Sequence, residues 1–366
     1  MQNPGEDSRP LSRLLLGACA LALSTACAAP VAAMTIVGRF DSSITSLANA
    51  ATVEADFNAV ARDYASSFSN PAAVNINVSW GSVAGQSLPS NAVGASVDSL
   101  YGYFTYAQVR SDLASFSARN PGDTALATAV KSMSTVAPTG PSRYVIPSSE
   151  AKALGLISPT QSYVDGSIGF AGATAGYDFD PTNGVTAGAY DFEAVAGHEI
   201  AEVLGRIGGI SSAAPAWRTP FDLERYNAPG VLDYGYNDAA YFSINGGVTD
   251  LKNFNNSSAG GDRSDWATVA NVFDVSNAFI QTGQSYKLTA ADLTALDVLG
   301  WGGSNLGDYG AASPGSTAFS LIAEAPGGVP EPADWALLIV GFGLTGAMFR
   351  RGARLQPARA VVPGAS

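Results

Sequence analysis

One short segment of the chain places side chains with acid–base and metal-ligand chemistry at helical spacing. It contains His198, Glu199 and Glu202, and His198 is the single histidine among the 366 residues. Side chains four positions apart on an α-helix project from the same side, so His198 and Glu202 would lie together, with Glu199 beside them. Imidazole and carboxylate groups bind divalent metal ions, and a further carboxylate can accept a proton. The segment therefore predicts a metal site with a general base next to it.

The surrounding residues predict the helix that would carry this site, from Tyr190 to Arg206. Asp191 is a favourable N-cap, and Glu193 lies in the first turn, where the helix dipole stabilises negative charge. Gly205 is a natural C-terminal stop. An apolar stripe follows one side of the predicted helix and consists of Phe192, Ala196, Ile200 and Val203. We expect this stripe to face the core, and the metal ligands to project from another face.

The order His198-Glu199-x-x-Glu202 is the His-Glu-x-x-His arrangement of zincin metalloproteases with the second histidine replaced by glutamate. In that arrangement the outer two side chains bind zinc, and the glutamate after the first histidine deprotonates the attacking water. We therefore predict that His198 and Glu202 are metal ligands and that Glu199 is the general base. The expected ion is Zn²⁺, with another divalent metal as the alternative. Because the chain has no second histidine, the third ligand must be a carboxylate.

The segment that begins at Phe221, 19 residues beyond Glu202, offers carboxylates for that role. Related zincins supply an acidic third ligand from a helix at this distance, and we choose Asp222, with Glu224 as the alternative. Arg225 or Tyr226 would stabilise the oxyanion of a tetrahedral intermediate.

Three more aspartates, Asp262, Asp265 and Asp274, lie near Gly260-Gly261. They lack the regular spacing of an EF-hand calcium loop. We interpret them as loop and capping residues and keep Ca²⁺ as an alternative ion.

The hydrophobic pattern of the body predicts an α+β fold, with the active-site helix beside a mixed sheet. Apolar residues recur at helical spacing over 54–68, 106–116 and 123–133, whereas 74–80 alternates as a half-buried strand does, and 166–171 is a short strand. We expect one zincin-like domain over 34–313, closed by Trp301; a semi-independent lobe after residue 210 is the alternative organisation.

Charge and cysteine content restrict the chemistry further. The formal net charge is −12, and such an acidic chain repels phosphate backbones, so we expect no nucleic-acid partner. The two cysteines, Cys19 and Cys27, both lie near the N-terminus. If that segment is removed, the mature protein has neither a thiolate metal site nor a cysteine nucleophile.

Both ends of the chain are predicted to be processing segments. In residues 1–33, two arginines precede an apolar run and then small residues, which is typical of a signal peptide that a signal peptidase removes. Residues 314–332 are predicted to be a flexible stalk, 333–354 a single-pass membrane tail and 355–366 a cytoplasmic tail. An uncharged stretch from Trp335 to Phe349 followed by a basic cluster carries the membrane prediction.

The tail also resembles a known sorting signal. Pro330-Glu331-Pro332, Trp335-Ala336 and the basic end are similar to the PEP-type (PEPxxWA-CTERM) signal that an exosortase recognises. The resemblance implies export, transient anchoring in the inner membrane by the C-terminal helix, and a final place at the cell surface or in the extracellular matrix.

The body resembles a family of secreted bacterial metalloprotease-like proteins. Its members carry a His-Glu-x-x-Glu-Val-x-Gly-Arg helix and then an Asp-Leu-x-Arg-Tyr segment ending in Pro-Gly, here Asp222 to Gly230. Further matches are Tyr241 to Gly247, Asp265-Trp266 and Leu288 to Trp301. The resemblance implies an exported peptidase that hydrolyses protein or peptide substrates. The alternatives are a non-catalytic surface or exopolysaccharide-matrix protein that keeps a degenerate fold, and a module in which the ion is only structural.

Overall fold

The computed structural model describes residues 34–172, 176–212 and 217–302, all of which belong to one compact unit. The predicted signal peptide, the predicted stalk and the predicted membrane and cytoplasmic tails lie outside these residues. Among the helices of the described part, none is long and apolar enough to cross a membrane.

The main sheet has four strands in the order β1-β2-β8-β5. They are β1 (Thr35–Phe40), β2 (Ala73–Trp80), β8 (Gly166–Phe170) and β5 (Gly94–Asp98). β1, β2 and β8 are parallel, whereas β5 runs antiparallel to β8 at the edge. The sheet is therefore mixed, as the sequence predicts.

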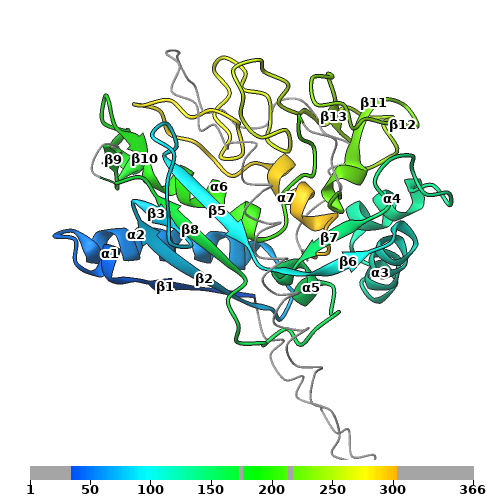
Figure 1. The fold of residues 1–366 in the computed structure, drawn as a ribbon, viewed down its shortest axis with the longest axis horizontal. Coiled ribbons are helices and arrows are strands. Elements are labelled where there is room, and N and C mark those ends of the chain that lie inside the picture. Colours follow the sequence, from blue (N-terminus) through cyan, green and yellow to red (C-terminus); the bar gives the residue numbers. More distant parts are fainter. Residues whose placement is uncertain (1–33, 173–175, 213–216, 303–366) are drawn as a thin grey trace, which may run out of the picture. The chain divides into compact units, whose positions relative to one another are not determined.

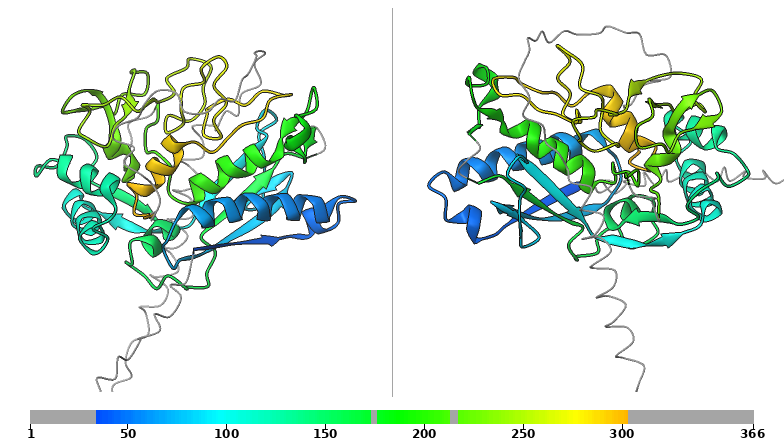
Figure 2. Two further views of the ribbon diagram at one scale, coloured as in Figure 1. Left: turned by 180° about the vertical axis from the view of Figure 1, so that it is seen from behind. Right: turned by 45° about the horizontal axis from the view of Figure 1, so that its top comes forward.

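Two long helices, α2 (Ala50–Ser67) and α6 (Phe192–Val203), pack against this sheet and against each other. Figures 1 and 2 show them side by side, with α2 near β1 and α6 near β5. On α2 the buried side chains recur at the helical spacing seen in the sequence: Val53, Phe57, Val60, Ala61 and Tyr64. The predicted helix and the predicted strand of β2 are both confirmed.

The other elements continue the chain around this layer. Between the main strands lie α1 (Ser42–Thr45), β3 (Ser82–Val83), β4 (Gln86–Ser87), β6 (Leu100–Phe104), α3 (Tyr106–Arg119), α4 (Thr124–Ser132), β7 (Tyr144–Pro147) and α5 (Ser148–Ala153). After β8 come β9 (Tyr177–Asp178), η1 (Pro181–Asn183), β10 (Tyr190–Asp191), α6, η2 (Phe221–Glu224), β11 (Arg225–Ala228), β12 (Val231–Leu232), β13 (Tyr241–Phe242), β14 (Lys252–Asn253) and α7 (Ala290–Asp297). A second four-stranded sheet has the order β12-β11-β13-β14.

The main hydrophobic core joins residues from before and after position 210. Ile200 of α6 shares it with Phe221, Phe242 and Trp266, which come from the later part of the chain. Trp301 is fully buried, and its indole N–H donates to the carbonyl of Leu204 at 2.7 Å. The later residues are therefore part of the same packed body and not a separate lobe, and Trp301 closes the core as predicted.

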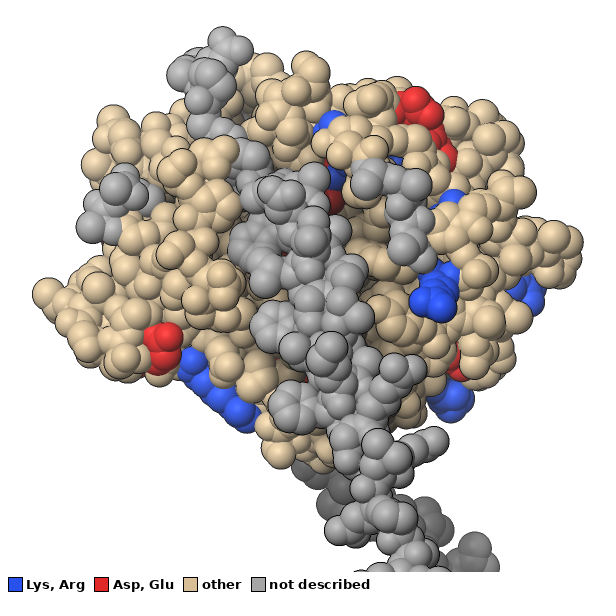
Figure 3. All heavy atoms as spheres, in the orientation of Figure 1, with Lys and Arg blue, Asp and Glu red and all other residues tan. Residues whose placement is uncertain are grey.

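Many charged side chains lie inside the protein. Arg206, Arg218 and Arg225 are among the largest fully buried side chains, and Lys152 is paired internally with Asp165. Figure 3 shows correspondingly few charged groups, scattered among uncharged ones, on the face that it draws. A buried charge is costly unless it is paired, so the partners of these side chains show which parts of the interior are built around charged groups.

Candidate metal centre

Helix α6 presents the His198 segment from the interior of the protein. Asp191 caps the helix, accepting a hydrogen bond from the backbone N–H of Ala194 at 3.1 Å, as the sequence predicts. Gly205 follows the helix with φ +112°, a conformation that favours glycine. The predicted apolar stripe is buried, but so is every other residue of the helix except Glu193. The side of α6 that carries His198 and Glu202 therefore faces a covered interior, because later segments of the chain pack over it.

The imidazole of His198 is oriented by a backbone group. Its Nδ1 lies 2.8 Å from the carbonyl oxygen of Val275, an acceptor, so Nδ1 carries the hydrogen, and in the neutral imidazole Nε2 has a free lone pair. This buried Nε2 has no hydrogen-bond partner. Metal-binding histidines commonly have this arrangement, with one ring nitrogen donating to a carbonyl and the other directed at the ion.

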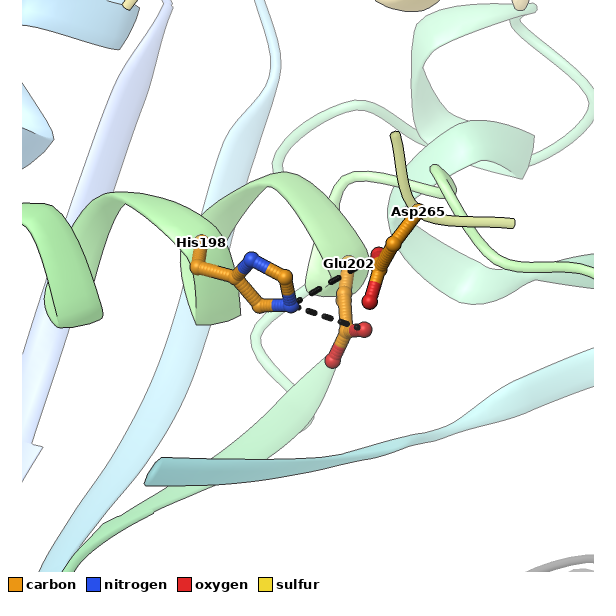
Figure 4. Close-up of side chains that lie close together, drawn as sticks. All are labelled: His198, Glu202 and Asp265. Carbon is orange, nitrogen blue, oxygen red and sulfur yellow. Dashed lines mark ion pairs between the residues drawn. The ribbon is translucent and has the colours of Figure 1, made fainter. Parts of the chain in front are cut away.

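Two carboxylates face that free nitrogen. Nε2 of His198 lies 3.5 Å from Oε1 of Glu202 and 3.7 Å from Oδ1 of Asp265 (Figure 4). One ligand atom from each of the three residues lies within 4.8 Å of the other two. Tetrahedral ligands at zinc distances of about 2.0–2.2 Å are separated by roughly 3.3–3.5 Å, close to the two spacings from Nε2. The buried group His198, Glu202 and Asp265 can therefore hold a metal ion.

Both carboxylates are held by neighbouring side chains, Glu202 through the oxygen that does not face His198 and Asp265 through the oxygen that does. Ser96 of β5 donates its hydroxyl to Oε2 of Glu202 at 2.6 Å. Arg206 donates Nη1 to Oδ1 of Asp265 at 3.1 Å and Nη2 to the carbonyl of Ser264 at 3.0 Å. The Arg206 guanidinium also lies over the Trp266 ring, 4.4 Å from its centroid. Outer contacts of this kind orient metal ligands and tune their affinity.

The two carboxylates of the group favour a positive charge beside them. Burial opposes the charged imidazole, but Asp265 and Glu202 outweigh it and raise the pKa of His198 well above its usual value. Burial raises the pKa of Asp265 to about 7, although the charge of His198 opposes this. A divalent cation would stabilise both carboxylates in their ionised form and compete with protons for the group.

Glu199 lies next to these ligands on the same helix. It is 1% exposed, and its Oε2 has no hydrogen-bond partner. Burial and then the charge of Glu202 raise the pKa of Glu199 well above its usual value. The carboxylate fits over β5 because Gly94 has no side chain: a Cβ at that position would overlap Oε1 of Glu199 and lie 2.7 Å from Cγ1 of Val195.

The third carboxylate of the group is not the one chosen from the sequence. Oδ2 of Asp222 accepts hydrogen bonds from the backbone N–H groups of Gly209 at 2.9 Å and Thr219 at 2.8 Å, so it fastens the loop after α6. Glu224, the alternative, is buried with both oxygens unpartnered, and burial raises its pKa to about 8. Neither residue belongs to the group that can hold a metal in the described part of the chain.

The two residues proposed for the oxyanion are also engaged elsewhere. Arg225 donates to the carbonyl of Arg263 at 2.8 Å and lies over the ring of Phe254. Tyr226 is 4% exposed, and Glu224 is among the charges that act on its phenol. Within the described residues, no hydrogen bond, ion pair or ring contact joins either side chain to His198, Glu202 or Asp265.

The three later aspartates divide between two roles. Oδ1 of Asp262 accepts from the backbone N–H of Ser264 at 2.6 Å, and Oδ1 of Asp274 accepts from that of Ser276 at 2.9 Å. These two are loop residues, as expected. Asp265 instead joins the metal group, and only its neighbour Trp266, a large side chain that anchors the loop in the core, marks it out in the sequence.

Comparisons of the chain with protein-family models, with curated proteins and with solved structures found no significant match.

Proposed function

We propose that this protein is an exported metal-dependent peptidase with a zincin-like active site. The observation that carries the proposal is the unpartnered Nε2 of His198, which faces Glu202 and Asp265 while Glu199 lies on the same helix. His198, Glu202 and Asp265 would hold the ion, with Zn²⁺ as the favoured metal because it accepts imidazole and carboxylate ligands together. A bound ion would polarise the scissile carbonyl and acidify a water molecule.

The protein's own residues supply the proton transfer. Glu199, with its raised pKa, would accept the proton of the attacking water on Oε2 and pass it to the leaving amine. Gly94 leaves room for that carboxylate, and Ser96 keeps Glu202 turned toward His198. A carboxylate that is a stronger base than an exposed glutamate suits this role near neutral pH.

The position of β5 supports a peptide as the substrate. β5 pairs with β8 on one side, and no other strand of the described ranges pairs with its outer side. The same strand carries Ser96, which contacts the metal ligand Glu202. An extended peptide can add to such an edge by backbone hydrogen bonds. The processing segments predicted at both ends, with signal peptidase and exosortase as partners, are the basis for placing the enzyme outside the cytoplasm.

One observation favours a second candidate, a protein in which the ion is structural. His198 is 7% exposed and Glu202 2%, and structural metal sites are closed, whereas catalytic sites keep a position open to substrate. In that case the protein would act at the surface or in the matrix without turnover.

Two substitutions separate the candidates. Wild type, His198→Ala and Glu199→Gln would be compared by elemental analysis and by hydrolysis of casein. We expect roughly one ion per wild-type chain, loss of that ion in His198→Ala, and retention of the ion in Glu199→Gln with turnover reduced on the order of 10²–10⁴-fold. Wild type that binds metal without cleaving any substrate would support the structural candidate, and an active Glu199→Gln protein would remove Glu199 from its role.

A further inference from the structure

Four arginines of the described residues are almost completely buried, and one of them is bonded differently from the rest. Arg206, Arg225 and Arg263 each direct both terminal guanidinium nitrogens at oxygen acceptors. Arg218, which is 2% exposed, uses only Nη2, which donates to the carbonyl of Thr139 at 2.9 Å. Its Nη1 and Nε have no acceptor, and no carboxylate of the described part forms an ion pair with it. A guanidinium stays charged inside a protein, so Arg218 is a buried cation without a carboxylate partner.

Two tyrosines whose hydroxyl groups also lack partners lie against this guanidinium. Among the described residues, the buried hydroxyls of Tyr144 and Tyr234 are the only buried phenols without a hydrogen-bond partner. Tyr144 forms a parallel β-bridge with Arg218, so the two side chains leave the backbone on the same side. The guanidinium carbon of Arg218 lies 3.1 Å from the centroid of the Tyr234 ring. Burial raises the pKa of Tyr144 and Arg218 opposes this, which agrees with the close approach.

The surroundings of Arg218 favour a small ligand. Gly140 has φ +113°, and a Cβ at that position would lie 2.3 Å from Nη2 of Arg218, so the backbone of this loop lies directly against the guanidinium. Asp222 carries the negative charge that acts on both phenols, but its Oδ2 is held by the backbone N–H groups of Gly209 and Thr219. It therefore compensates Arg218 only from a distance. A large ligand would have to displace these segments, whereas a small ion would not.

The chemistry of the unpartnered groups selects the ligand. The guanidinium nitrogens can only donate, and a neutral phenol donates its hydrogen. Arg218 would repel a cation, and a neutral ligand would leave its charge uncompensated. An anion accepts hydrogen bonds from all of these groups and offsets the charge as well. We propose that Arg218, Tyr144 and Tyr234 bind a small monovalent inorganic anion, for which chloride is the probe.

The anion would fasten the segment before η2 to β7. The N–H of Val145 in β7 donates to the carbonyl of Arg218 at 2.7 Å, and the N–H of Arg218 donates to the carbonyl of Arg143 at 2.9 Å. An ion between the side chains of Arg218 and Tyr144 would add a second connection to these backbone bonds. In the described ranges no hydrogen bond, ion pair or ring contact joins Arg218 to the metal group, so the two sites are separate.

The test is thermal unfolding of the purified protein at one pH and one ionic strength, with sodium chloride replacing sodium gluconate, whose anion is too large for an enclosed site. An ion that binds only the folded protein raises the Tm with its concentration, and the curve gives an apparent dissociation constant. We expect chloride to stabilise wild type. Arg218→Met removes the buried charge and keeps much of the side-chain volume, so this variant should lose the stabilisation by chloride.

Two smaller changes keep the test open if Arg218→Met does not fold. Tyr144→Phe and Tyr234→Phe each remove one donor and keep the ring. Each should raise the apparent dissociation constant for chloride at least about tenfold, as expected for the loss of one hydrogen bond to a charged group. Tyr106→Phe is the matched control, because its ring lies 6.0 Å from that of Tyr144 but its hydroxyl donates to the carbonyl of Ser134 at 2.7 Å. It should lower the Tm and leave the chloride dependence unchanged.

Three results would overturn the proposal. The first is a wild-type Tm that is the same in chloride and in gluconate at every concentration. The second is a chloride dependence that persists in Arg218→Met and in both phenylalanine variants at Tyr144 and Tyr234, since the ion then binds elsewhere. The third is an equal loss of chloride dependence in Tyr106→Phe and Tyr144→Phe, since the effect would then follow stability and not the unpartnered hydroxyl.

Discussion

Two buried clusters of acidic residues in this protein differ in which groups their side chains contact. The group of His198, Glu202 and Asp265 and the segment from Asp222 to Tyr226 are both almost inaccessible. In the first, contacts from Val275, Ser96 and Arg206 orient the side chains while Nε2 of His198 stays free. In the second, Asp222 and Arg225 are engaged by backbone groups, and Glu224 meets no partner.

The difference shows that burial and residue type do not identify a metal ligand. A ligand needs a free lone pair directed at a point that other ligands share, and an outer contact that holds it there. Asp222 fails the first condition because it does not lie with His198 and Glu202; its Oδ2 accepts two backbone N–H groups, which makes it a structural acceptor in a loop. Asp265 meets both conditions.

The largest difference between the two clusters should appear in metal affinity when their buried arginines are substituted. Arg206→Lys removes the planar guanidinium that donates to Asp265 and to the carbonyl of Ser264. Lysine cannot make both of these directed hydrogen bonds. We expect the metal dissociation constant to rise about 10–100-fold. Arg225→Lys makes the same change at a buried arginine of the second segment and should leave metal affinity unchanged. Calorimetric titration of both apoproteins with Zn²⁺ measures this, and equal losses would mean that Arg206 supports only the fold.

A smaller effect is expected from the glycines of the adjoining strands. Gly94→Ala would force Glu199 and Val195 to move, at a cost of about 1–3 kcal/mol, with turnover reduced and the metal kept. Gly102→Ala in β6 is the control, because a Cβ there meets only the Phe104 ring, at 3.6 Å. Neither glycine has a positive φ, so space and not backbone strain is tested. Urea unfolding and peptide hydrolysis would be measured. A Gly94→Ala variant that hydrolyses peptide as fast as wild type would refute the positioning of Glu199.

The helices of the fold could be predicted from the sequence. Which distant residues meet at the site could not. Periodicity and the Asp191 cap predict α2 and α6, because helix formation depends on neighbours within a few positions. Asp265 meets Arg206 across 59 residues, and Val275 meets His198 across 77. The intervening segment has no periodic pattern, and its path is set by the packing of Trp266 and Phe254. The sequence therefore predicts that the third metal ligand is a carboxylate, but it does not distinguish Asp265 from Asp222.

An effect on stability alone, and not on the metal, is expected from Glu224 through its dependence on pH. Burial raises the pKa of Glu224 from 4.5 to about 8, so between these values the folded protein keeps a proton that the unfolded chain has released. Unfolding then releases a proton, and the group lowers stability by about 1.4 kcal/mol per pH unit as pH rises through that window. Glu224→Gln should remove this component. Denaturant unfolding from pH 5 to 9 measures it, and identical slopes for both proteins would contradict the assignment.

Asp265 as the third ligand distinguishes the proposed metal site from the alternatives, and one paired measurement tests this assignment most directly. Asp265→Asn and Asp222→Asn make the same isosteric change at two buried aspartates, and an amide oxygen at 222 can still accept from Gly209 and Thr219. Bound zinc and its dissociation constant would be measured for both variants beside wild type. We expect Asp265→Asn to lose the metal or bind it at least about tenfold more weakly, and Asp222→Asn to bind as wild type does. The reverse pattern would contradict the account and restore Asp222 as the ligand.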